Sequence, residues 1–195
     1  MGRKFWGLSA SGILLQRASD GKVCLFHRKG TMNSGTWGVN GGKIDHGEDA
    51  KESAIRETQE EACGGRPLPK GHFTGKTFVF KTPLGPEDYI DGDDYRSPNE
   101  NRYAEEGEEF TYTTYHYMVE DDNWQPRLNW EHDKWDWFDL DELPKDTVTL
   151  KDENGKPVKP VAMMLTKLPA KQTKQKKQSS QKQDLKETFA QFCSE

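Results

Sequence analysis

Residues 41–65, GGKIDHGEDAKESAIRETQEEACGG, constrain the fold of this chain more than any other segment. A glycine pair stands at each end, and between the pairs carboxylates outnumber basic side chains. We expect a helix over residues 49–63, with Gly64 and Gly65 at its C-terminal cap. One face of this helix is able to pack on a sheet, and its residues are Ile55, Thr58 and Ala62.

The acidic side chains of this helix are closely spaced. Glu57, Glu60 and Glu61 stand at i, i+3 and i+4, so they crowd one side of the helix. Like charges at this spacing destabilise a helix, and Arg56, within reach of Glu60 or Glu48, does not neutralise them all. A solvated acidic face explains the pattern, and so does a divalent cation. Oxygen ligands of this kind suit Mg²⁺ or Mn²⁺.

The rest of the chain is mainly strand-like. Runs rich in aromatic and β-branched residues predict strands. They are residues 7–16, 22–30, 72–82, 109–120 and 134–140. Asp20-Gly21 indicates a hairpin turn between the first two, and residues 31–42 have the glycine and asparagine content of a loop. A short helix is predicted over residues 161–168.

Two segments differ from this pattern. Residues 84–109 are acidic and rich in Gly, Pro and Asn, so we expect a long inserted loop that shapes the binding pocket or is mobile. Residues 169–195 begin as a lysine- and glutamine-rich tail, which predicts disorder. We therefore expect one domain, residues 1–168, followed by this tail.

Composition limits the class of protein. The net charge of −5 argues against attraction of the whole protein to nucleic acid or to an anionic membrane. Three scattered cysteines form neither a zinc pattern nor a disulfide framework, so we expect a cytoplasmic protein. No apolar run approaches the length of a transmembrane helix.

The acidic segment also resembles the Nudix box of the Nudix hydrolases, G-x5-E-x7-R-E-U-x-E-E-x-G-U, where U is a bulky apolar residue. Gly42, Glu48, Arg56-Glu57 and Glu60-Glu61 match in register. Departures from the box are Thr58 at the first U, Cys63 at the second Gly and Gly64 at the last U. The resemblance implies a Nudix fold, an α/β/α sandwich with a mixed β-sheet.

The resemblance also implies a metal-dependent hydrolase. Glu57, Glu60 and Glu61, with a backbone carbonyl of Gly41 or Gly42, would bind Mg²⁺ or Mn²⁺. Glu48 and Arg56 would hold the loop and the helix together through an ion pair. The general base would be Glu61 or Glu60, or Glu131 on a downstream loop as some family members have it. A surface glutamate without a role is an equally good interpretation of Glu131.

The substrate implied is a nucleoside diphosphate joined to another group, such as ADP-ribose, a dinucleoside polyphosphate or a (d)NTP. Arg28 and Lys43 are candidates to contact its phosphates, and Trp37 is a candidate platform for its base. An RNA 5′ end is the alternative substrate, because the lysine-rich tail would bind RNA weakly. A nucleotide-binding module without catalytic activity is the alternative function.

Overall fold

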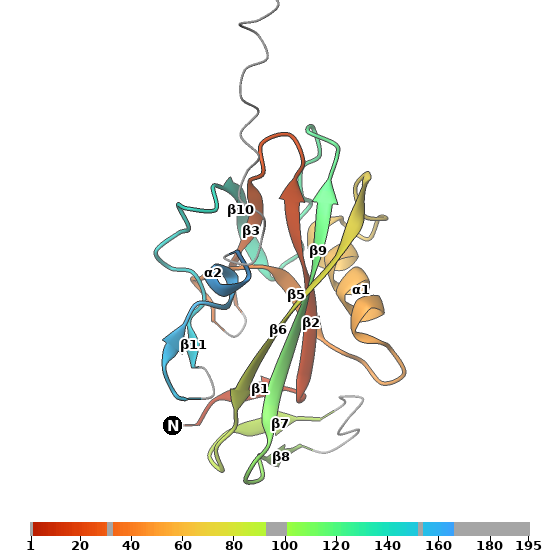
Figure 1. The fold of residues 1–195 in the computed structure, drawn as a ribbon. Helices are drawn as coiled ribbons and strands as arrows, with labels where there is room; N and C mark the ends of the chain where they lie inside the picture. Colours follow the sequence, from red (N-terminus) through yellow and green to blue (C-terminus); the bar gives the residue numbers. More distant parts are fainter. Residues whose placement is uncertain (1, 31–32, 93–100, 152–153, 166–195) are drawn as a thin grey trace, which may run out of the picture.

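A seven-stranded mixed sheet forms the centre of the structure, a computed structural model that describes residues 2–30, 33–92, 101–151 and 154–165. Five of its strands run in the order β10-β3-β2-β9-β6. Their bounds are His132–Phe138, Val23–Arg28, Ser9–Arg17, Glu109–Val119 and Gly71–Pro83, respectively. β2 and β9 are parallel and the other neighbours are antiparallel, which confirms the expected mixed sheet (Figure 1).

Two shorter strands complete this sheet. β4 (Trp37–Gly38) pairs with β3, and β5 (Asn40–Lys43) pairs with β2. The prediction of a loop over residues 31–42 is therefore wrong for these positions. Their glycines obscured the strands because glycine weakens a strand signal in the sequence, although its backbone pairs as any other does.

One long helix, α1 (Ala50–Ala62), covers one face of the sheet. Ala54 and Ala62 pack there against Ile13, Leu15 and Phe26. Thr58 is fully buried where the Nudix box has an apolar residue, and its hydroxyl donates to the carbonyl of Ala54 at 2.7 Å. That bond satisfies the polar group and explains why threonine is tolerated at this position.

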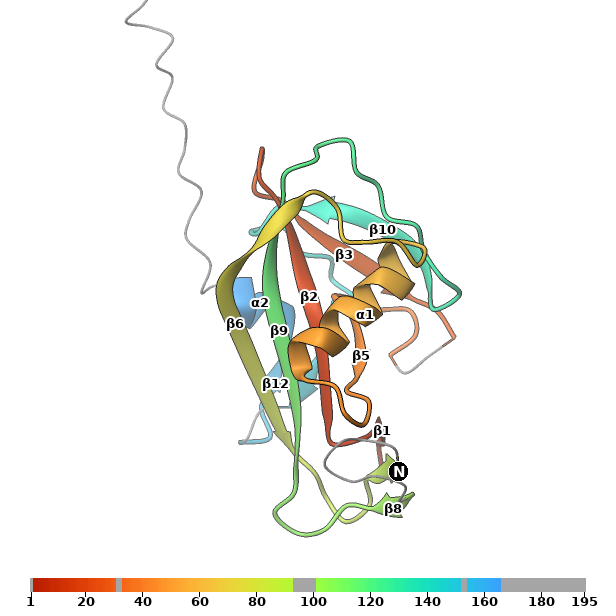
Figure 2. The ribbon, with the colours of Figure 1, turned by 90° about the vertical axis from the view of Figure 1, so that its right-hand side faces the viewer.

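The opposite face carries the short helix α2 (Pro160–Leu165), as Figures 1 and 2 show. Val161 and Met164 of α2 pack on Leu14, Leu25 and Phe78. The two helices thus enclose the sheet, as an α/β/α sandwich requires. The short hairpin of β11 (Leu150–Lys151) and β12 (Pro157–Val158) precedes α2.

The acidic insertion is more ordered than the sequence predicts. A second sheet has the order β1-β7-β8, with bounds Lys4–Trp6, Tyr89–Asp91 and Arg102–Tyr103. It has a core of its own, formed by Phe5, Leu8, Leu84, Ile90 and Ala104. The prediction of a loop over residues 84–109 is wrong for β7 and β8, because these strands pair with each other and Ile90 and Ala104 pack in a core with Phe5 of the N-terminal strand.

The predicted tail, residues 169–195, lies outside the described residues, as does the end of the predicted helix 161–168. Within the described part of the chain, no helix has the length and apolar character needed to cross a bilayer.

Candidate active site

Helix α1 begins at a capping box that fixes which side chains face the sheet. The carboxylate of Asp49 accepts hydrogen bonds from the backbone N–H groups of Lys51 and Glu52. The Glu52 carboxylate accepts one from the N–H of Asp49. With the first turn fixed in this way, Glu61 is directed inward and Glu60 outward, where its side chain is 55% exposed.

Glu61 is a buried carboxylate at the glycine strand β5. It is only 2% exposed, and its Oε2 accepts a 2.8 Å hydrogen bond from the N–H of Gly41. Burial raises its pKa to about 8, and the charges of Glu57 and Glu131 add to the shift. The bond from Gly41 and the charge of Arg28 oppose this shift.

Glu57 lies against the next glycine. A Cβ placed on Gly42 would stand 2.5 Å from the Glu57 carboxylate, so only glycine allows this approach. Burial raises the pKa of Glu57, while the guanidinium of Arg56 acts in the opposite direction. The two glycines therefore let two acidic side chains of α1 reach the backbone of β5.

Arg56 connects the loop before α1 to the acidic side of the helix. It lies 2.8 Å from Glu48, 2.8 Å from Glu57 and 3.6 Å from Glu60. It also donates to the carbonyl of Lys43. The hydrogen bond from Arg56 lowers the pKa of Glu48. The ion pair that the resemblance implied between Glu48 and Arg56 is thus present.

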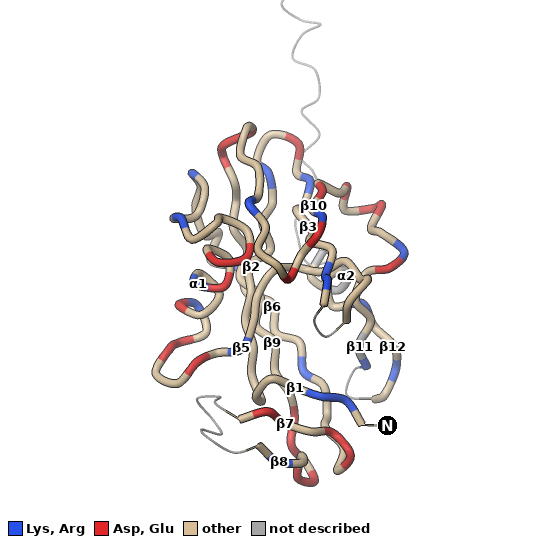
Figure 3. The backbone as a smooth tube through the Cα atoms, turned by 180° about the vertical axis from the view of Figure 1, so that it is seen from behind, with Lys and Arg blue, Asp and Glu red and all other residues tan. Residues whose placement is uncertain are grey.

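Glu131 comes close to this cluster from the loop before β10. Its backbone N–H is held by the side chain of Asn129 at 2.9 Å, and its carbonyl accepts from the N–H of Lys29 at 2.7 Å. Its charge is near enough to raise the pKa of both Glu57 and Glu61. The structure therefore brings together glutamates that are far apart in the sequence. Figure 3 shows the acidic positions along α1.

Two polar side chains beside these glutamates were not predicted. Asn40 and His132 are buried, and within the described residues the Asn40 amide and both His132 ring nitrogens have no hydrogen-bond partner. Burial, and then the charge of Arg28, lowers the pKa of His132 to about 4. Burial without a partner is visible only in three dimensions, so the sequence carried no signal for it.

A cavity of about 190 Å³ lies on the other face of the sheet, beneath α2. Gly41, Gly42, Lys43 and Arg28 line its polar end. Gly41 borders both sides of the sheet, because its N–H bonds Glu61 while a Cβ on it would approach the Tyr112 hydroxyl. The cavity and the glutamates are therefore separated only by β5.

The structure does not place Trp37 at this cavity. Its ring packs against His27 and Phe138, with centroids at 5.2 and 5.1 Å. Trp37 is therefore absent from the lining of this cavity, and its role as the base platform stays a prediction. Two aromatic residues that line the cavity, Phe5 and Trp6, were not predicted. Their signal was the KFW triplet before the first predicted strand.

Comparison with known proteins places this geometry in a family. The sequence model of the NUDIX domain matches residues 8–159 of the 195. The chain belongs to the NUDIX family. A nucleoside triphosphate pyrophosphatase/Nudix hydrolase fusion protein of Bifidobacterium longum is 47% identical over 68 residues. That match spans 31% of this chain and 14% of the fusion protein.

Solved structures show more distant likenesses. An Ap4A hydrolase of C. elegans has 18% identity and a TM-score of 0.45, covering 69% of this chain and 82% of its own. The E. coli dihydroneopterin triphosphate pyrophosphohydrolase has 15% identity and a TM-score of 0.47, covering 71% and 85%. Both TM-scores lie below 0.5, so the family assignment depends on the domain match.

Proposed function

We propose that this NUDIX chain is a metal-dependent hydrolase that cleaves a diphosphate linkage in a nucleoside diphosphate derivative. The proposed substrates are ADP-ribose, dinucleoside polyphosphates and (d)NTPs. One observation carries the proposal: the buried Glu61 is bonded to Gly41, and Gly41 also lines the cavity. A substrate in the cavity thus has its phosphates at the strand that separates it from the glutamates.

The acidic cluster fits a hard divalent cation. Glu61 is buried and Glu57 is partly buried, both lie near the charge of Glu131, and loss of solvent raises the pKa of both. Carboxylate oxygens gathered in this way are the ligands that Mg²⁺ and Mn²⁺ prefer. Gly42 keeps the space that a Cβ would fill beside Glu57. The proposed ligands are Glu57, Glu60 and Glu61.

Binding requires a local rearrangement of these side chains. Among the described residues, no three His, Cys, Asp or Glu side chains already converge as a set of metal ligands. Glu57 is instead paired with Arg56 at 2.8 Å, and Glu60 is directed toward solvent. Rotation of Glu60 toward Glu57 would complete the set, while Arg56 keeps its bonds to Glu48.

The chain's own residues have distinct tasks in this proposal. Arg28 and Lys43, at the polar end of the cavity, hold phosphate oxygens. When bound, the divalent ion offsets phosphate charge and lowers the pKa of an attacking water. A carboxylate accepts the proton of that water, and the candidates are Glu61, Glu60 and Glu131. Glu48 and Arg56 keep the loop in place.

The test is hydrolysis of a nucleotide panel by the purified protein with Mg²⁺ or Mn²⁺. The panel holds ADP-ribose, NAD, diadenosine polyphosphates, canonical and oxidised (d)NTPs, and a 5′-triphosphate RNA. We expect cleavage of at least one nucleotide, and loss of that activity in Glu57→Gln and in Glu61→Gln. Folded variants that cleave as fast as the wild type would refute the site.

A further variant separates Glu131 from Glu60 and Glu61 as the candidate base. Glu131→Gln is expected to lower kcat at least tenfold if Glu131 accepts the proton, with the Mn²⁺ affinity unchanged by calorimetry. An unchanged kcat assigns that role to the glutamates of α1. If the wild type binds Mn²⁺ and hydrolyses no member of the panel, the result would favour the alternative function, a nucleotide-binding module without catalytic activity.

A further inference from the structure

The end of the cavity away from the glycines is aromatic. The walls of this aromatic end include Phe5, Trp6, Phe78, Phe80 and Phe110, whereas the hydroxyl of Tyr112 lies beside Gly41. No Asp or Glu is among the described residues that line the cavity, and Asn33 and Thr114 are its neutral polar side chains other than Tyr112. The Tyr112 hydroxyl already donates to the carbonyl of Asn40. This end of the cavity therefore offers ring faces and few hydrogen-bonding groups.

Trp6 is the most exposed of these rings. It lines the cavity and yet is 50% exposed, which is unusual for a large aromatic side chain with a sheet beside it. Its neighbour Phe5 is buried and packs on Phe110 with centroids 5.0 Å apart. Phe5 thus anchors the strand, and Trp6 is left with accessible ring surface at the cavity.

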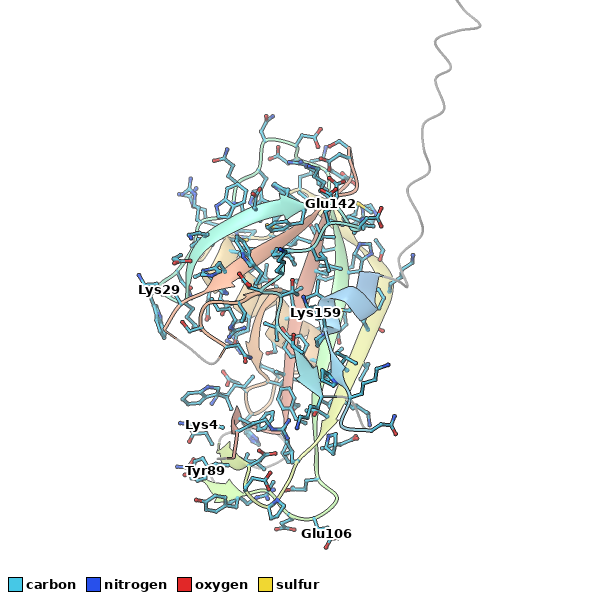
Figure 4. All side chains as sticks on the ribbon, turned by 90° about the vertical axis from the view of Figure 1, so that its left-hand side faces the viewer. Lys4, Lys29, Tyr89, Glu106, Glu142 and Lys159 are labelled. Carbon is cyan, nitrogen blue, oxygen red and sulfur yellow. The ribbon has the colours of Figure 1, made fainter. Side chains whose placement is uncertain are left out.

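The acidic insertion holds Trp6 in this position. β1 pairs in parallel with β7, which places Trp6 beside Asp91 and Lys4 beside Tyr89. Lys4 forms a 2.8 Å ion pair with Asp91, and its ammonium lies 4.1 Å from the centroid of the Trp6 ring. Figure 4 shows Lys4 and Tyr89 at the same end of the molecule. These contacts fix the ring before any ligand arrives.

We propose that this aromatic end binds the nucleobase of the substrate by stacking on Trp6, with little preference among bases. The proposal rests on the proposed function and adds the mode of recognition. Stacking tolerates any base because every base has a π face. Strong discrimination requires buried hydrogen-bonding groups that a wrong base leaves unpaired, and the cavity wall has few.

The size of the cavity agrees with one base. Sites that enclose a whole drug-sized ligand measure roughly 300–1,000 Å³, whereas this cavity measures about 190 Å³. A base fills the aromatic end, and the attached phosphates extend past Gly41 and Gly42 toward Arg28 and Lys43.

Calorimetry with nucleoside 5′-monophosphates tests the proposal. These ligands contain no phosphoric anhydride, so the proposed reaction does not consume them. AMP, GMP, CMP and UMP are titrated into the protein with Mg²⁺ present, and ribose 5-phosphate serves as the ligand without a base. We expect the four nucleotides to bind within about tenfold of one another and ribose 5-phosphate to bind at least about tenfold more weakly.

Variants assign the effect to one ring. Trp6→Ala is expected to weaken nucleotide binding roughly 5- to 150-fold, which corresponds to about 1–3 kcal/mol, and to leave ribose 5-phosphate unaffected. Trp6→Phe should keep most of the affinity, and it remains informative if Trp6→Ala does not fold. Trp130→Ala is the matched control, because Trp130 is 72% exposed and does not line the cavity.

Several results would overturn the proposal. They are a preference above hundredfold for one base, equal binding of ribose 5-phosphate, full affinity in a folded Trp6→Ala, and no nucleotide binding at all. Hydrolysis that depends on Glu57 together with any of these results leaves the hydrolase function standing and removes only the stacking site. Base stacking without hydrolysis of any panel member removes the hydrolase function instead.

Discussion

Replacement of the buried Glu61 by glutamine separates the stability of the metal-free protein from its activity. The carboxylate is buried beside other glutamates, and its pKa is raised to about 8. Glutamine has nearly the same shape and still accepts the hydrogen bond from Gly41 through its amide oxygen. We therefore expect Glu61→Gln to fold, to lose activity and to be more stable than the wild type at neutral pH without metal.

The magnitude follows from proton linkage. The ordinary pKa of Glu61 is 4.5, and the folded-state value is about 8. Between these values the folded protein keeps a proton that the unfolded chain releases, so stability falls as pH rises. The loss is at most about 1.4 kcal/mol per pH unit. From pH 5.5 to 7.5 the wild type should lose about 2–3 kcal/mol relative to the variant, or roughly 4–12 °C in Tm.

The assay is urea denaturation in EDTA at pH 5.5, 6.5 and 7.5, followed by circular dichroism. Glu60→Gln is the matched control, because it removes the same charge from the neighbouring exposed position and keeps Glu61. It should therefore show the same loss as the wild type. Parallel pH curves for wild type and Glu61→Gln would refute the reasoning. Adding Mg²⁺ at pH 7.5 should stabilise the wild type and not the variant.

Two further predictions concern the elements that hold the site. Gly41→Ala should cost about 2–6 kcal/mol in urea denaturation, because φ is +142° and the new Cβ would lie 2.3 Å from the carbonyl oxygen of Ser11. Gly47→Ala is its control and should cost less, since φ is +91° but no atom lies within 4 Å of its Cβ. Asp49→Ala should cost about 0.5–2 kcal/mol by loss of the helix cap, whereas Asp49→Asn should retain most of the stability. Equal losses within either pair would contradict these assignments.

The sequence predicted those parts of the fold whose signals are local. α1 was predicted within a residue at each end, because the Asp49 cap and Gly64-Gly65 are signals in adjacent residues. The proximity of Glu48 and Arg56 was also predicted, since their separation is fixed by one loop and two turns of helix. The α/β/α sandwich was predicted from the resemblance to the Nudix family and not from local patterns.

Other features were not predictable from local patterns. The pairing of β1 with β7 brings together Lys4 and Tyr89, which are far apart in the sequence, and no residue near either of them predicts this pairing. Trp37 was a candidate from the sequence and Trp6 was not, yet tertiary packing places the Trp37 ring against Phe138 and leaves Trp6 at the cavity. Whether a tryptophan lines the cavity therefore depends on the residues that pack against it and not on its residue type.

The single strand β5 acts as a partition between two compartments of the protein. On one side of β5, its glycines contact the glutamates of α1. On the other side, the same glycines line the cavity. The cavity's far wall is built by β1 and α2, which lie outside that partition. Changes to those two segments should therefore alter which molecules are admitted without disturbing the acidic cluster, so selectivity in this chain is open to redesign independently of its chemistry.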